Sequence, residues 1–228
     1  MKASIATIAL ATCAAFATLG FTTTASAQEV TYLPAGKDHS VGLSSGLDSA
    51  MIARLGYSYR LRPSFWDHDV LFQSAFTMPI ATPDFADSRL ETSLRTTAIA
   101  YKDLRLQFGL GVLLHNTSNV AFSANGLGVA ATLLPGYQSG HWGLMAELGY
   151  EKMFATHLRP SDLYLERGYA GAKSGWYADT AGTFRLGLRG GARIGAIELN
   201  ARLGVTATEQ GTPLVPPFYG TLGAAFAF

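Results

Sequence analysis

The stretch MIARLGYSYRLR, residues 51–62, alternates between two kinds of side chain. One set is apolar or aromatic throughout: Met51, Ala53, Leu55, Tyr57, Tyr59 and Leu61. The other set has arginine at positions 54, 60 and 62, together with Ile52, Gly56 and Ser58. Successive side chains of a β-strand point to opposite faces of the sheet, so the stretch predicts a strand with one oily and one charged face.

The same alternation returns at residues 104–114, 142–151 and 197–207. These four runs are 10 to 12 residues long, whereas strands of globular proteins average about 5–6 residues. A strand that crosses a bilayer at a tilt needs about 9–11 residues. The length of the runs therefore favours strands that span a membrane, with the apolar set toward lipid and the charged set toward a lumen.

A membrane-spanning sheet must close on itself, because an open edge would leave backbone groups without hydrogen-bond partners in lipid. After position 27 the chain has no run of 18 apolar residues that would make a spanning helix. We therefore predict an all-β fold: an antiparallel, transmembrane, up-and-down β-barrel of ten strands. The strands are expected at about 39–47, 50–62, 69–80, 89–101, 104–115, 122–134, 141–152, 181–191, 195–207 and 216–228. Eight strands remain an alternative, because the first and sixth runs are rich in glycine, serine and alanine.

The first 27 residues have the features of a secretory signal peptide. Lys2 precedes an apolar stretch, and Ala25-Ser26-Ala27 fits the small-residue pattern of a cleavage site. Residues 28–228 would then form a single barrel domain. Cys13 is the only cysteine and lies in the segment to be removed. Without Lys2 the mature chain holds 16 basic and 16 acidic side chains, a balance that favours no nucleic-acid partner.

The connections follow the asymmetry of bacterial barrels, whose turns are short on the periplasmic side, where both termini lie, and longer outside. Ten strands put the inner turns at 63–68, 102–103, 135–140 and 192–194, and the outer loops at 48–49, 81–88, 116–121, 153–180 and 208–215. The outer loop 153–180 is the longest and mixes aromatic with charged residues. Such a loop suits either contact with a partner or a cap over the barrel mouth.

The chain ends in TLGAAFAF, with Thr221 as a polar position, Gly223 two residues later, and Phe226 and Phe228 at the last alternate positions. This ending resembles the C-terminal β-signal of bacterial outer-membrane β-barrel proteins of the small OmpA/OmpW-like class. The resemblance implies Sec-type export, recognition by the barrel-assembly machinery, and a place in the outer membrane among its lipid and lipopolysaccharide. It covers the architecture and carries no motif for a particular function.

Eleven charged residues share the inward phase of the predicted strands. They are Arg54, Arg60, Glu91, Arg95, Arg105, Glu147, Glu151, Arg185, Arg189, Glu198 and Arg202. A barrel of about eight strands has room inside only for side chains, and charges buried there must pair. The set is typical of either a salt-bridge lattice that fills the interior or a narrow, arginine-rich pore for small solutes.

The sequence offers little for chemistry. The five histidines show no metal-binding spacing, and no motif indicates a cofactor. His115 and Ser118 stand close together in sequence, which leaves a lipid-modifying hydrolase open as an alternative. The expected function is thus a structural or narrow-pore barrel of the cell envelope and not an enzyme, with a hydrolase or a surface barrel for adhesion or partner binding as alternatives. The oligomeric state is left open.

Overall fold

The computed structural model describes residues 33–48, 50–64, 68–80, 86–167 and 171–228. Within these residues, ten strands close into a single barrel in which every neighbouring pair is antiparallel. The prediction of an all-β, antiparallel, up-and-down barrel of ten strands is confirmed, and the eight-strand alternative is wrong. The predicted signal peptide, residues 1–27, lies outside the described residues.

The strands follow one another around the barrel in chain order. Their bounds are β1 His39–Asp48, β2 Ala50–Leu61, β3 Val70–Pro79, β4 Ser88–Tyr101, β5 Leu104–Ser118, β6 Phe122–Gln138, β7 Trp142–Pro160, β8 Gly175–Ile194, β9 Ile197–Thr208 and β10 Pro213–Ala227. A short helix, α2, spans Asp162–Arg167. No helix in the described ranges is both long and apolar enough to cross a membrane.

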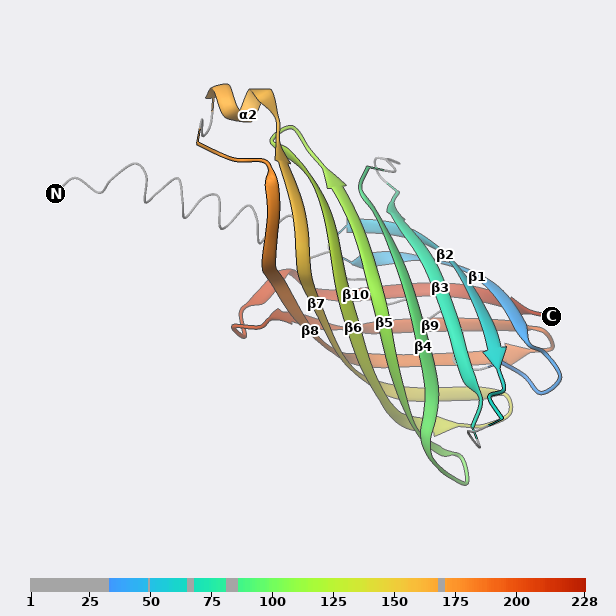
Figure 1. Ribbon diagram of the computed structural model, residues 1–228. Coiled ribbons are helices and arrows are strands. Elements are labelled where there is room, and N and C mark those ends of the chain that lie inside the picture. Colours follow the sequence, from blue (N-terminus) through green and yellow to red (C-terminus); the bar gives the residue numbers. More distant parts are fainter. Residues whose placement is uncertain (1–32, 49, 65–67, 81–85, 168–170) are drawn as a thin grey trace.

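The barrel closes where its first strand meets its last. Ser40 to Asp48 of β1 pair with Ala227 to Tyr219 of β10. Beyond this register, the backbone N–H of Phe228 donates to the carbonyl of His39 at 2.9 Å, and that of His39 donates to the carbonyl of Phe228 at 3.1 Å. We call this end of the barrel the terminal end and the opposite one, near α2, the loop end (Figure 1).

Burial alternates along the strands as the sequence predicts. On β2, the inward Arg54 and Ser58 are 4% and 2% exposed. The outward Leu55 between them is 56% exposed, and Met51 near the start of the strand is 52% exposed. The same holds around the barrel, so polar side chains fill the inside and large apolar ones cover the outside. We call this outer surface the apolar belt. It includes Leu43, Leu55, Leu94, Leu110, Val112, Leu144, Leu148, Leu186, Leu188, Leu199, Leu203 and Leu222.

The predicted loop 153–180 is largely wrong. β7 continues to Pro160 and β8 begins at Gly175, so the connection is only the short segment that holds α2. The two strands stay paired across this stretch, from Ala155↔Ala178 to Leu158↔Gly175. Sequence alternation fails here because a β-bulge between Met153 and Ala155 shifts the phase by one residue.

Strands β5 to β8 therefore run on together at the loop end, past the end of β9, and α2 follows β7 at their tip (Figure 1). β6, β7 and β8 have 17, 19 and 20 residues, against 10 in β1 and in β3. We call the extension the raised sheet, formed by Asn116–Ser118 of β5, Phe122–Leu127 of β6, Ala155–Pro160 of β7 and Gly175–Ala178 of β8.

Candidate functional site: the charged lumen and its mouth

The barrel interior is dense in charge. Among the described residues, six arginines and five carboxylic acids are buried: Arg54, Arg89, Arg95, Arg185, Arg189, Arg202, Asp48, Glu91, Glu147, Glu151 and Glu198. Each projects from the inward phase of its strand. Isolated charges so buried would be costly, so their mutual arrangement decides whether the barrel is stable.

The first cluster is centred on Glu147 of β7, which is fully buried. Its carboxylate accepts two hydrogen bonds from Arg202 of β9: Nε donates to Oε2 at 2.6 Å, and Nη2 donates to Oε1. Nη2 of Arg189 on β8 lies 3.5 Å from the same Oε2. The forked contact with Arg202 is the geometry in which a guanidinium binds a carboxylate best.

Tyr219 of β10 joins this cluster to the next one. The guanidinium carbons of Arg202 and Arg185 lie 4.7 Å and 5.0 Å from the centre of its ring. Both distances are within the range of cation–π attraction. Its ring also fills the space left by Gly187 and Gly204, where an added Cβ would overlap the tyrosine.

The second cluster is a chain of alternating charges nearer the loop end. Arg89 lies between two acids, at 3.2 Å from Glu91 and 3.1 Å from Glu151. Arg185 lies between Glu151 at 3.5 Å and Asp48 at 3.2 Å. The chain thus links β4, β7, β8 and β1 across the lumen.

The remaining predicted lumen residues divide by position. Glu198 pairs with Arg193 at 3.1 Å, and Arg54 and Arg95 are buried inside the barrel. Arg60 is at the terminal end, where its guanidinium donates to the carbonyls of Leu33 and Pro34 and lies 3.3 Å from Asp69.

Arg105 differs from the prediction. It is only half-buried, and its guanidinium donates to the carbonyls of Lys102 and Leu104, closing the β4–β5 turn at the terminal end. The structure therefore places Arg105 at the turn, where it binds backbone carbonyls, and not among the paired charges of the lumen.

Apolar side chains fill the space that the charges leave. Leu113, Leu134 and Met145 are at most 1% exposed although they share the inward phase. Leu113 also packs with Ala130 and Met153 in a small apolar cluster. Between this packing and the paired charges, the lumen is filled with side chains rather than left as a wide channel.

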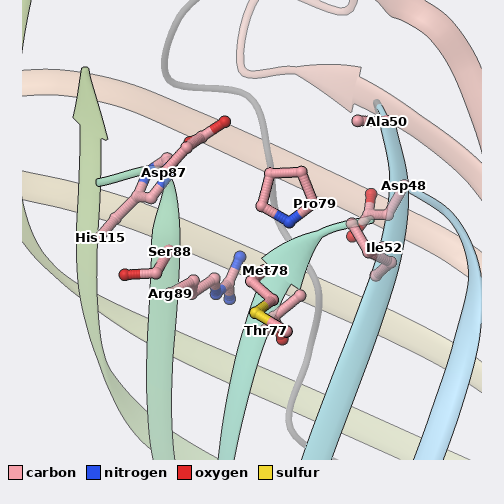
Figure 2. Close-up of a pocket in the computed structure, with 10 residues that line it drawn as sticks. All are labelled: Asp48, Ala50, Ile52, Thr77, Met78, Pro79, Asp87, Ser88, Arg89 and His115. Carbon is pink, nitrogen blue, oxygen red and sulfur yellow. Dashed lines mark ion pairs between the residues drawn. The ribbon is translucent and has the colours of Figure 1, made fainter. Parts of the chain in front are cut away.

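A cavity of about 30 Å³ lies at the loop end, just above the second cluster. Figure 2 shows its lining side chains coming from β1 to β5, with Arg89 reaching toward its centre. His115 Nε2 stands 3.9 Å from Asp87 Oδ1 on one wall, and Asp48 stands on the other. A space of this size holds about one water molecule, so the mouth is a shallow pit in which charged side chains stand among apolar ones such as Ile52, Met78 and Pro79.

His115 and Ser118 are not brought together as a catalytic pair would be. His115 is buried in the inward phase of β5, whereas Ser118 is exposed in the outward phase of the same strand. Nor does any group of three potential metal ligands form among the residues that the structure describes.

The four residues of the predicted assembly signal lie on the closing strand. Phe226 and Phe228 point outward and are 53% and 50% exposed, and Phe228 stacks on His39 with ring centres 5.6 Å apart. Gly223 faces inward, where an added Cβ would come within 2.6 Å of the Cβ of Ser44. Thr221 is half-buried on the same face.

Three members of the network were missed in the sequence: Asp48, Arg89 and Tyr219. Arg89 shares the phase of Glu91, and Tyr219 that of Thr221, so alternation alone could have found both. The sequence places Asp48 in a loop because no long apolar run marks the end of β1 as a strand.

The fold and this interior define a class: a closed ten-stranded antiparallel barrel with an apolar exterior and a paired, charged core. No protein-family model matches the chain, and no curated protein matches it significantly in sequence.

Proposed function

We propose that this protein is an outer-membrane β-barrel that acts as a closed structural scaffold in the cell envelope of a Gram-negative-type bacterium. The observation that carries the proposal is the inverted polarity of the barrel. Water-soluble proteins bury oily side chains and expose charged ones, whereas here Leu55, Leu110 and Leu203 are 54–59% exposed and Arg185 and Glu147 are buried.

The dimensions of the apolar belt support the same proposal. Its outward positions run from Leu104 to Leu114 on β5 and from Ile197 to Val205 on β9. These segments of 9 to 11 residues match the length that a tilted strand needs to cross the hydrocarbon layer, about 9–11 residues.

Aromatic side chains gather where the belt ends at the terminal end. The rings of Tyr137 and Trp142 lie tilted against each other with centres 4.8 Å apart, and His39 stacks on Tyr59 at 4.8 Å. Aromatic girdles of this kind mark the interface between lipid and water in membrane barrels. Under this proposal the terminal end faces the periplasm and the raised sheet stands outside the cell.

The filled lumen favours a scaffold over an open pore. A conducting path would have to pass the Glu147 cluster and the Glu91-to-Asp48 chain, whose members are at most 7% exposed. A narrow pore is the second candidate, favoured by the pit at the mouth, whose lining includes Asp48 and Arg89 of the charged interior. Charge at such a constriction would set ion selectivity.

The proposal is tested by fractionating cells and running the membrane fraction on a gel with and without heating. We expect the protein in the outer membrane as a compact band that shifts on heating. A protein recovered in the soluble periplasmic fraction would overturn the proposal. Single-channel recording of the refolded barrel then separates the two candidates: a silent bilayer supports the scaffold, and discrete conductance steps support the pore.

A further inference from the structure

The outward face of the raised sheet continues the strands of the apolar belt but has a different chemistry. Beyond Leu114, the outward phase of β5 changes to Asn116, which is exposed. The register then aligns Asn116 with Asn125 of β6, Asn125 with His157 of β7, and His157 with Trp176 of β8. Since neighbouring strands are about 4.8 Å apart, this row of four side chains extends over about 14 Å.

Trp176 is the most unusual member of the row. It is 71% exposed, and its ring lies 5.2 Å from that of His157 at an interplanar angle of 60°. A large exposed aromatic ring in one row with two amide side chains suits contact with a ligand that is partly apolar and rich in hydroxyls, because amides donate and accept hydrogen bonds.

Arg159 adds a positive charge to this face. It lies two residues beyond His157 in the same outward phase and is exposed. Within the described part of the chain it has no ion pair, whereas Lys152, farther down the same strand, is held 2.6 Å from Glu209. A guanidinium with this freedom can bind a phosphate through two parallel hydrogen bonds.

We infer that this face, made of Asn116, Asn125, His157, Arg159 and Trp176, binds the phosphorylated sugar headgroup of lipopolysaccharide. The inference rests on the proposed function, since the face meets a lipid headgroup only if the belt sits in the membrane. It goes beyond that function by naming one site and one ligand chemistry. Arg159 contacts a phosphate, the two asparagines contact sugar hydroxyls, and Trp176 packs on a sugar face.

Two observations fix this occupant. The face is continuous with the apolar belt on β5 and β6, so a ligand there has its acyl chains against Leu114 and Val129. Its free charge is positive, which complements a phosphate. At the terminal end, the positive charge of Arg62 is already neutralised, because its guanidinium lies 2.5 Å from Asp38.

The test uses the full mature chain refolded in detergent, with purified lipopolysaccharide carrying lipid A and inner-core sugars as the probe. Trp66→Phe and Trp142→Phe leave Trp176 as the only reporter of fluorescence. We expect its emission to change on titration with lipopolysaccharide, and Arg159→Ala to weaken the apparent affinity about tenfold, as the loss of a charged hydrogen bond predicts. Arg62→Ala is the matched control and should leave the affinity unchanged.

Lipopolysaccharide with its phosphates removed should bind wild type and Arg159→Ala equally. Equal affinity of Arg159→Ala and wild type for the phosphorylated probe would overturn the inference. Each variant is first checked for the compact, heat-shifted band that shows a folded barrel. A chain that inserts into the outer membrane but ignores the probe refutes this inference alone, whereas a chain recovered soluble from the periplasm refutes the proposed function beneath it.

Discussion

Glu147 and Arg202 form the most tightly joined charge pair of the barrel interior, since Nε of Arg202 donates to Oε2 of Glu147 at 2.6 Å and Nη2 donates to the other carboxylate oxygen. Glu147 also neutralises Arg189, 3.5 Å away on the next strand. One carboxylate thus balances two buried guanidiniums. The stability of the barrel should depend strongly on its charge.

Glu147→Gln keeps the shape of the side chain but removes that charge. Removing one partner from a buried pair costs about 3–5 kcal/mol, so we expect the unfolding midpoint of the refolded barrel in urea to fall sharply. Glu209→Gln is the control, because it also removes one negative charge but breaks a more exposed pair with Lys152, worth about 0–1 kcal/mol. Equal midpoints for the two variants would show that the lumen pairs are not structural.

The ring of Tyr219 occupies space that is open only because residues 187 and 204 are glycines. At Gly187 an added Cβ would overlap the hydroxyl of Tyr219 and the carbonyl of Leu203. We expect Gly187→Ala to displace the ring from between Arg185 and Arg202 and to destabilise the barrel by about 1–3 kcal/mol, as overpacking does. Gly175→Ala adds the same methyl group where nothing lies within 4 Å. Its unfolding curve should match wild type, and a similar loss in both variants would contradict the packing argument.

The sequence predicted the barrel well because strict alternation recurs over long runs of residues. On β2 and β5 a slip of one residue would expose arginines or a glutamine to the oily side, so the register is strongly set. The raised sheet was missed for the opposite reason. Beyond the belt, neither face of β7 and β8 needs to be uniformly apolar, and the bulge at Phe154 reverses the phase.

The partners within the lumen could not be predicted from sequence. Alternation placed Arg185 and Glu147 inside, but it could not show that Arg185 pairs with Asp48, 137 residues away. That contact depends on how far successive strands are staggered around the closed barrel. Arg105 failed for a local reason: it stands next to a tight turn, where Lys102 adopts a positive φ of 54° and offers its carbonyl.

Barrel closure should depend on the last residue of the chain. Phe228 exchanges two backbone hydrogen bonds with His39 and stacks on its ring. We expect deletion of Phe228 to reduce the heat-shifted form in the outer membrane severely, because both the closing contact and the proposed assembly label are lost. Phe154→Ala removes an exposed aromatic ring from the bulge of β7 and should leave the heat-shifted band at the wild-type level. An undiminished band after deletion would assign assembly to other residues.

The apolar belt makes the sharpest distinction between a membrane barrel and a water-soluble one. Leu110 is 54% exposed near the middle of the belt on β5, and Leu163 is 47% exposed on α2, outside it. An arginine on the lipid face near the midplane costs about 2–4 kcal/mol, so Leu110→Arg should lower the guanidinium midpoint of barrels folded into phospholipid vesicles. Leu163→Arg should not, because its charge stays in water. If both variants have the same guanidinium midpoint as wild type, the surface around Leu110 is not in contact with lipid. The barrel would then be a water-soluble one.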